Sequence, residues 1–109
     1  MKLDKTEVVK ITHELHEKLS EVYGDRMREV YLYGSYARDQ ADEDSDIDIA
    51  VVLSGSVNRA EERARVSGIA SDISLRYNCL ITLFFMSEDD LKSQPYAVHR
   101  SIAREGVAV

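Results

Sequence analysis

The sequence has almost no cysteine, proline or tryptophan. Its single cysteine, Cys79, rules out an intramolecular disulfide and a zinc site built from several cysteines. Long apolar runs are absent too, because the longest, residues 79–86, is far too short to span a bilayer. The first ten residues carry alternating charges and no apolar segment, so we expect no secretory signal and no membrane association. These features predict a cytoplasmic protein.

Positive charge is also scarce. The chain has 14 Lys and Arg against 20 Asp and Glu, and its net charge is -6. Nonspecific binding to nucleic acid needs cations against phosphate, so we expect no direct nucleic-acid contact. An acidic surface suits a site that requires a metal, or a basic protein partner. The length of 109 residues, with 44% hydrophobic residues, predicts a single domain over residues 1–109.

The spacing of apolar residues predicts two long amphipathic helices. Asp4 and Glu7 form a capping box that begins the first helix, and Gly24 ends it. Asn58 with Glu61 is a cap for the second. The inner faces are expected to carry Val8, Ile11, Leu15, Leu19 and Val22 in the first helix, and Ala64, Val66, Ala70, Ile73 and Tyr77 in the second.

Three segments rich in β-branched and apolar residues predict strands at 30–33, 47–53 and 79–86. The third is apolar almost throughout, so we expect it at the centre of the sheet or covered on both faces. The remaining elements are a helical turn at 88–92, a helix at 95–104 that begins with proline, and an edge strand at 107–109. This order predicts an α/β (α+β) fold with a short mixed β-sheet flanked by helices.

Residues 34–48, GSYARDQADEDSDID, carry different chemistry at their two ends. Gly34 follows a predicted strand and lets a ligand approach the backbone, while the Ser35 hydroxyl and the free N–H groups of a following helical turn suit a phosphate. Asp46 and Asp48 are two residues apart at the start of a strand, so their carboxylates are expected on one face, where Mg²⁺ relieves their repulsion. Side by side, the two ends suit metal-assisted phosphoryl transfer.

Each end alone has an ordinary structural explanation. A Gly-Ser pair after a strand is usually only a turn, and the acidic residues 42–44 are expected to be solvated loop. An Asp-x-Asp at a strand start is common and often faces water. The joint pattern favours a site, because Asp46 and Asp48 lead directly into the apolar segment 49–53.

The pattern Gly-Ser, ten intervening residues, then Asp-x-Asp resembles the signature of the polymerase-β-like nucleotidyltransferase superfamily. The segment GSYARDQADEDSDIDIAVVL is similar to the smallest members, the minimal nucleotidyltransferase (MNT) domains. The leading helix, the strand before Gly34 and the ending HRSIAREGVAV extend the resemblance over nearly the whole chain. It implies the polymerase-β-like nucleotidyltransferase core.

The resemblance also implies roles for individual residues. Gly34 and Ser35 would contact the phosphates of ATP, and Asp46 and Asp48 would be the catalytic residues that bind Mg²⁺. Arg38 occupies the position of a frequent family arginine, which either touches phosphate or forms a salt bridge within the loop. Ser45 would support the two carboxylates as a cap or brace rather than bind the metal itself, and it would lie beside the bound nucleotide.

One departure from the family pattern concerns the third predicted strand. Catalytically complete members supply a third carboxylate there, but residues 79–86 contain none, and Thr82 is the only hydroxyl. Asp72 falls on the preceding helix and Glu88 lies just after the strand. Three accounts remain: two aspartates suffice, Glu88 or a partner completes the site, or catalysis is lost and binding is retained.

Minimal members of the superfamily commonly work beside an all-helical HEPN protein, an RNase toxin. The resemblance therefore implies an antitoxin that transfers AMP from ATP to a tyrosine of a HEPN toxin and silences it, with oligomers formed through the toxin. One alternative is a non-catalytic antitoxin that masks the toxin by binding. Another is transfer to a small molecule, although such enzymes usually carry an additional C-terminal domain.

The histidines are expected to have structural or surface roles. His13 and His16 are three residues apart on the first helix, but the sequence offers no third ligand that would make them a metal site. His99 and Arg100, on the last helix, are expected on a solvated face.

Overall fold

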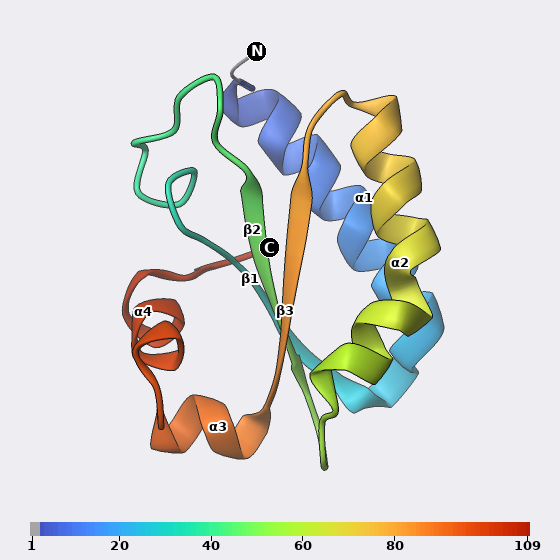
Figure 1. The fold of residues 1–109 in the computed structure, drawn as a ribbon, viewed down its shortest axis with the longest axis vertical. Coiled ribbons are helices and arrows are strands. Elements are labelled where there is room, and N and C mark those ends of the chain that lie inside the picture. The colour runs from blue at the N-terminus through green and yellow to red at the C-terminus, as the bar shows by residue number, and fades with distance from the viewer. Residues whose placement is uncertain (1–2) are drawn as a thin grey trace.

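The computed structural model describes residues 3–109 and contains a four-stranded mixed sheet with helices on both faces (Figure 1). The strands are β1 (Met27–Tyr33), β2 (Ile47–Leu53), β3 (Ile81–Ser87) and β4 (Val107–Ala108). They lie in the order β3-β2-β1-β4; β1 is antiparallel to β2 and β4, and β3 is parallel to β2. The predicted short mixed sheet is therefore confirmed.

Helices α1 (Lys5–Tyr23) and α2 (Arg59–Arg76) cover one face of the sheet, and a short 3-10 helix, η1 (Gly24–Arg26), links α1 to β1. Helix α4 (Ala97–Glu105) packs on the other face, joined to β3 through α3 (Glu88–Ser93) (Figure 1). Within residues 3–109, every helix is too short or too polar to cross a membrane.

The predicted helix caps are nearly all present. Asp4 and Glu7 form the reciprocal capping box of α1, and Gly24 closes that helix with φ 54°. Asn58 accepts the backbone N–H of Glu61 at the start of α2. The boundary predicted at Pro95 is wrong, because α4 begins after the cap residue Tyr96 and Pro95 lies outside the helix.

The two faces of the sheet bury different side chains of β2. Ile47, Ile49, Val51 and Leu53 pack with α1 and α2, whereas Ala50 and Val52 pack with Ile102 of α4. Because both neighbours of β2 are strands and both faces are covered, β2 is the buried centre of the molecule.

The strand β3 lies at the edge of the sheet and is covered on both faces, which confirms the second of the two predicted alternatives: the α2 side buries Leu83 and Phe85, and Phe84 packs on the α4 side. The structure corrects two other predictions of burial. Val22 and Ala64 are exposed, and their neighbours Tyr23 and Glu62 are buried instead. His99 is only 4% exposed, packed against Phe84 and Tyr96, so the predicted solvated face is wrong for this residue.

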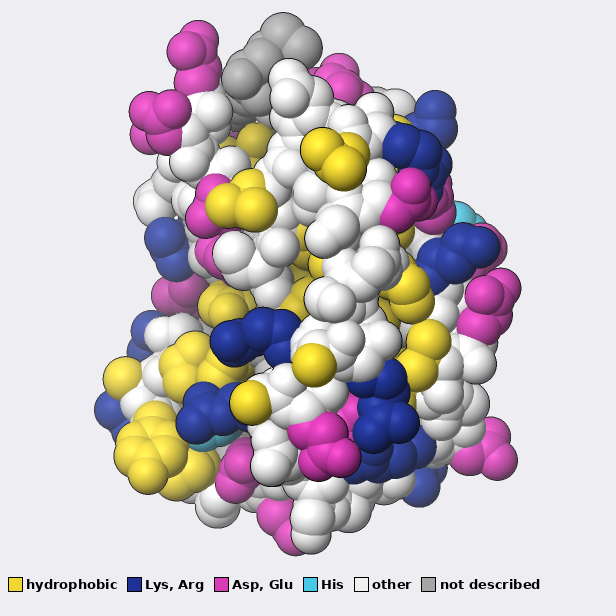
Figure 2. Space-filling model, turned by 45° about the vertical axis from the view of Figure 1, so that its right-hand side comes forward, with side chains coloured by type: hydrophobic (Ala, Val, Ile, Leu, Met, Phe, Trp, Pro, Cys, Tyr) yellow, Lys and Arg dark blue, Asp and Glu magenta, His cyan; other side chains and the backbone are white. Residues whose placement is uncertain are grey.

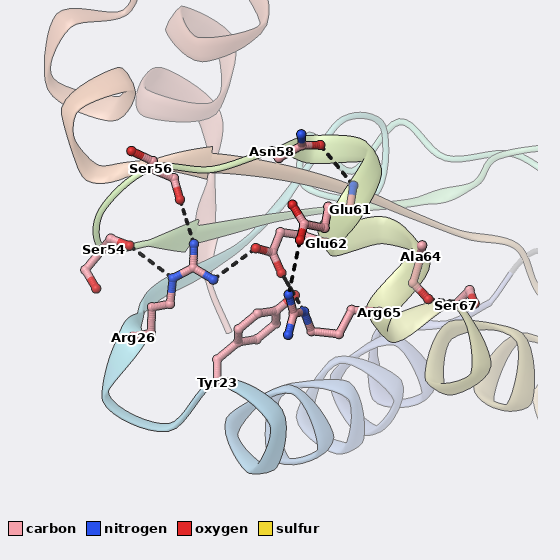
Figure 3. Close-up of polar contacts among 10 residues, drawn as sticks. All are labelled: Tyr23, Arg26, Ser54, Ser56, Asn58, Glu61, Glu62, Ala64, Arg65 and Ser67. Carbon is pink, nitrogen blue, oxygen red and sulfur yellow. Dashed lines mark hydrogen bonds and ion pairs between the residues drawn. The ribbon is translucent and has the colours of Figure 1, made fainter.

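Glu62 holds together a polar network between α1, α2 and the β2–α2 turn (Figure 3). Its carboxylate accepts hydrogen bonds from Arg26 (2.9 Å), Arg65 (3.0 Å) and the hydroxyl of Tyr23 (3.1 Å). Arg26 also donates to the carbonyls of Ser54 and Ser56, at 3.2 and 2.7 Å. Burial alone raises the pKa of Glu62, but the hydrogen bonds and guanidinium charges outweigh it and lower the pKa.

Candidate active site

The turn that follows β1 begins at Gly34, whose φ is +74°. The backbone N–H groups of Ala37 and Arg38 both donate to the Gly34 carbonyl at 3.1 Å, and that of Gln40 donates to the Ser35 carbonyl at 2.9 Å. These bonds confirm the predicted helical turn. The N–H groups from residue 37 onward are hydrogen-bonded within the turn. The N–H groups of the first residues of the turn have no partner within it and point toward its start, where an anion is favoured.

Asp48 lies directly beside this turn. It is the β2 partner of Tyr33, the last residue of β1, and a Cβ atom added to Gly34 would overlap the Asp48 carboxylate. On its other side, Asp48 is paired with Thr82 of β3, whose hydroxyl donates a 2.6 Å hydrogen bond to Oδ1. Three strands therefore position this carboxylate, and only glycine at position 34 leaves room for it.

Tyr33 is the aromatic neighbour of the site. Burial and the adjacent negative charge of Asp48 raise the pKa of Tyr33 to about 12. Its phenol therefore stays protonated and neutral at physiological pH. Tyr33 is therefore a neutral aromatic neighbour of Asp48 rather than a charged group.

The close approach of Gly34 to Asp48 makes a matched pair of glycine variants informative. Gly34→Ala and Gly55→Ala both place a side chain at positive φ, which costs about 1–2 kcal/mol for an L-residue. Only Gly34→Ala also displaces Asp48, since nothing lies within 4 Å of a Cβ at Gly55. We expect both variants to stay folded by thermal unfolding, with Gly34→Ala the less stable of the two, and only Gly34→Ala to lose the phosphoryl-transfer chemistry predicted from the sequence. Equal activity in the two variants would contradict this placement of Asp48.

The other predicted site residues have different neighbours. Arg38 forms an ion pair with Glu105 of α4 at 3.2 Å, so its salt bridge connects the loop to α4 and does not lie within the loop. The Ser45 hydroxyl donates to Asp42 at 3.2 Å and accepts the Asp42 backbone N–H at 2.9 Å. Ser45 therefore braces the loop carboxylate Asp42, while its predicted contact with nucleotide or with the two aspartates stays a prediction.

Asp46 lies just before β2, at the end of the sheet. It lines a hollow of about 230 Å³ together with Ser45, Tyr36 and residues 78–80. The structure thus brings Gly34, Asp48 and Thr82 together. Asp46 precedes the strand, which begins at Ile47, so strand alternation does not fix the direction of its side chain, and the shared face of Asp46 and Asp48 stays a prediction.

Another hollow, of about 680 Å³, borders the turn but not Asp48. It is lined mainly by apolar side chains, including Val8, Leu32 and Tyr36. Val8 and Leu32 belong to the core on the α1 side, whereas Asp48 alternates with Ile49 and shares the face of Ala50. The size of this hollow fits a small ligand, but the carboxylate of the site lies across the sheet from it.

The strand register identifies what stands in place of a third carboxylate. Thr82 is directly opposite Asp48, whereas Glu88 lies six residues further along, about 20 Å at the rise of an extended strand. Glu88 pairs instead with Arg28 at 3.6 Å. Of the three accounts left open by the sequence, the one in which Glu88 completes the site does not fit this geometry. The contact of Thr82 with Asp48 was missed, because only the β2–β3 register reveals it.

A mixed sheet that joins a glycine turn to a carboxylate-bearing strand is the arrangement expected of a nucleotidyltransferase core. The family model described as a nucleotidyltransferase domain matches residues 12–102, and the chain belongs to this family. The protein is thus a nucleotidyltransferase. It is 34% identical, over 76 residues, to "Putative protein adenylyltransferase MJ0141" of Methanocaldococcus jannaschii, a match covering 70% of this chain and 76% of the relative.

Solved structures share the fold. A structure named as a "putative nucleotidyltransferase from Sulfolobus solfataricus" superposes with a TM-score of 0.66 at 23% identity, covering 94% of this chain and 79% of its own. A chain from a complex of the tri-AMPylated Shewanella oneidensis HEPN toxin with its MNT antitoxin superposes with a TM-score of 0.53 at 16% identity, covering 91% and 69%. At these identities the likeness shows the fold alone.

Proposed function

We propose that the protein is a Mg²⁺-dependent adenylyltransferase of the antitoxin type. It transfers AMP from ATP to a tyrosine hydroxyl of a HEPN-type RNase toxin and thereby neutralises it. The observation that carries the proposal is the contact of Gly34 with Asp48, which joins the turn for phosphates to a carboxylate for metal. The names of the relatives support the acceptor class, since one is named for protein adenylyltransfer and another complex contains an AMPylated HEPN toxin.

The donor atoms present fit Mg²⁺. Within residues 3–109, no three His, Cys, Asp or Glu side chains form a cluster that could hold a metal. Mg²⁺ does not need such a cluster, because it is usually held by one or two carboxylates, with water and substrate phosphates as further ligands. Asp48, with Asp46 two residues earlier, would supply these oxygens.

The proposed reaction needs little from the protein beyond positioning and charge. The tyrosine oxygen forms a bond to the α-phosphorus as the bond to pyrophosphate breaks, and the phenol proton is released to solvent. A bound Mg²⁺ supplies neutralisation of the phosphate charge. The turn at Gly34 and Ser35 orients the triphosphate, and Thr82 holds Asp48 in one rotamer through its 2.6 Å hydrogen bond.

The experiment that tests the proposal uses the intact chain, ATP, Mg²⁺ and the purified product of the neighbouring gene. We expect the mass of that product to increase by one or more AMP units on a tyrosine, and its RNase activity to fall in parallel. No mass increment, together with no ATP binding, would contradict the proposal.

A masking antitoxin without chemistry is the second candidate, favoured by the absence of a carboxylate on β3. Residues 81–87 contain no Asp or Glu, and the residue of this strand that lies opposite Asp48 is Thr82. Masking predicts that neutralisation survives loss of the aspartates, whereas the enzyme proposal predicts that it does not.

The role of Thr82 gives a separate expected result. Thr82→Val keeps the shape of the side chain but removes the hydrogen bond to Asp48. Partners that orient a metal ligand typically contribute about 10–100-fold to metal affinity or activity, so AMP transfer should fall by about that factor. Thr82→Ser, which keeps the hydroxyl, is the matched control and should retain most activity. Equal rates for the Val and Ser variants would rule out positioning by Thr82.

A further inference from the structure

β3 presents an open edge beside the site. Within residues 3–109 it pairs only with β2, so its other side offers backbone N–H and C=O groups without a strand partner. Two hollows of about 420 and 460 Å³ follow this edge between β3 and α2 and share Ala70, Ser71 and Ile81. The small side chains of α2 leave this space open along the edge.

Two arginines of α2 border the same edge. Arg59 lies over the ring of Phe84, with 5.3 Å between the guanidinium carbon and the ring centroid, and Arg63 lines a hollow together with Thr82. Among the described residues neither forms an ion pair or a side-chain hydrogen bond, whereas the nearby Arg65 pairs with Glu62 at 3.0 Å. On a chain of net charge -6, this pair of unneutralised cations is a local exception that favours an anionic ligand.

The edge is continuous with the catalytic carboxylate. Thr82 lines the hollow and donates its hydrogen bond to Asp48, so one residue joins the two places. Leu75 and Leu80 line the second hollow and are 82% and 57% exposed. Figure 2 shows this side of the molecule, where hydrophobic side chains (yellow) and white surface, which includes backbone, run along the middle and Lys and Arg side chains (dark blue) border the lower part.

The spacing of the arginines matches an extended strand. Arg59 and Arg63 are four residues apart on α2, which is about 6 Å along a helix. Alternate residues of a strand are separated by about 6.6 Å and point to the same side. The positions of the two arginines along α2 therefore match the spacing of acidic side chains two residues apart on an added strand.

We propose that the acceptor protein docks here as an extended acidic segment that adds a strand to β3. Its carboxylates pair with Arg59 and Arg63, and its tyrosine enters beside Thr82 and faces Asp48. The inference rests on the proposed function for the fate of the tyrosine, but the docking itself does not require chemistry. Backbone pairing supplies affinity and the arginines supply selection for acidic residues around the tyrosine.

The test measures binding of a fluorescent peptide to the intact chain without nucleotide. The probe is a nine-residue peptide with a central tyrosine and glutamates at alternate positions, and its counterpart carries lysine in place of each glutamate. We expect the glutamate peptide to bind at least about tenfold more tightly, and the Arg59→Glu/Arg63→Glu double variant to lose at least about tenfold in affinity. Amide chemical shifts should change along residues 81–87.

Lys10→Glu is the matched control, because Lys10 is exposed on α1, away from the edge. It should change the affinity less than about twofold. Equal binding of both peptides, or shift changes centred on the hollow at Leu3 and Tyr36, would overturn the docking site. Binding at β3 without AMP transfer would contradict only the proposed function. Normal AMP transfer by the Arg59→Glu/Arg63→Glu variant would contradict only the docking site.

Discussion

The Asp48→Asn variant is expected to lose AMP transfer by at least about a hundredfold while its fold is retained, a cost typical of removing one main electrostatic contact from an active site. Asparagine has nearly the shape of aspartate, so the neighbours Gly34 and Thr82 can stay in place. What is lost is the negative charge that would hold Mg²⁺ beside the triphosphate. Rates of AMP incorporation into the partner protein, with thermal unfolding as the check on folding, measure the effect.

The control for this experiment lies in the same loop. Asp44→Asn removes one charge from an exposed residue whose backbone N–H donates to Asp42, and it should leave the rate unchanged. Asp46→Asn tests whether the second aspartate shares the metal, because a loss as large as that of Asp48→Asn requires both carboxylates. Full toxin neutralisation by the Asp48→Asn variant would contradict the enzyme proposal and favour masking.

The Glu62→Ala variant is expected to be strongly destabilising, by about 3–5 kcal/mol. Glu62 is 3% exposed, and its removal leaves the partly buried Arg26 guanidinium and the Tyr23 hydroxyl without their acceptor. The carbonyls of the turn after β2 bind the same arginine, so the connection between α1 and α2 loosens as well. Urea unfolding of the intact chain measures the free energy of unfolding directly.

Glu61→Ala is the matched control, since Glu61 precedes Glu62 and forms only an exposed 3.9 Å ion pair with Arg65. Such a pair contributes at most about 1 kcal/mol. The pKa of Glu62 is lower in the folded protein than in the unfolded chain, so its stabilisation is complete above the unfolded pKa. It is lost as the pH falls towards the folded pKa. The wild type should therefore lose stability below about pH 4.5 more steeply than Glu62→Gln, and equal slopes would contradict this role.

Much of the fold could be predicted because local signals and tertiary contacts agree. The capping box at Asp4, the cap at Asn58 and the glycine at position 24 mark helix ends that the structure confirms. The position of β3 could not be predicted, because an apolar run reports burial on two faces and not the number of strand neighbours. The burial of Glu62 was missed for a related reason. Its partner Arg26 lies 36 residues away in the sequence, and a prediction from helical spacing places a charged residue on the exposed face.

The candidate site was predictable in part. The approach of Gly34 to Asp48 follows from their positions at the facing ends of two antiparallel strands. Glycine and aspartate are also residue types that by themselves suggest a close backbone approach and metal binding. Thr82 and the two arginines of α2 carry no such signal, since threonine and exposed arginine are common everywhere. Their relation to Asp48 depends on the β2–β3 register and on how α2 packs, which only the structure provides.

The antiparallel pairing of Tyr33 with Asp48 has a consequence for how this protein can change in evolution. The turn and the carboxylate are fixed by the ladder between β1 and β2, so the middle of the loop that joins the strands, residues 39–44, need not set their separation. Lengthening such a loop costs little, because closure entropy grows slowly with length. A shift of the ladder by one residue would instead turn Asp48 into the apolar core. Residues 39–44 can therefore diverge freely and recruit new contacts, whereas Gly34, Ser35 and Asp46 are held by the proposed site and insertions within either strand are selected against.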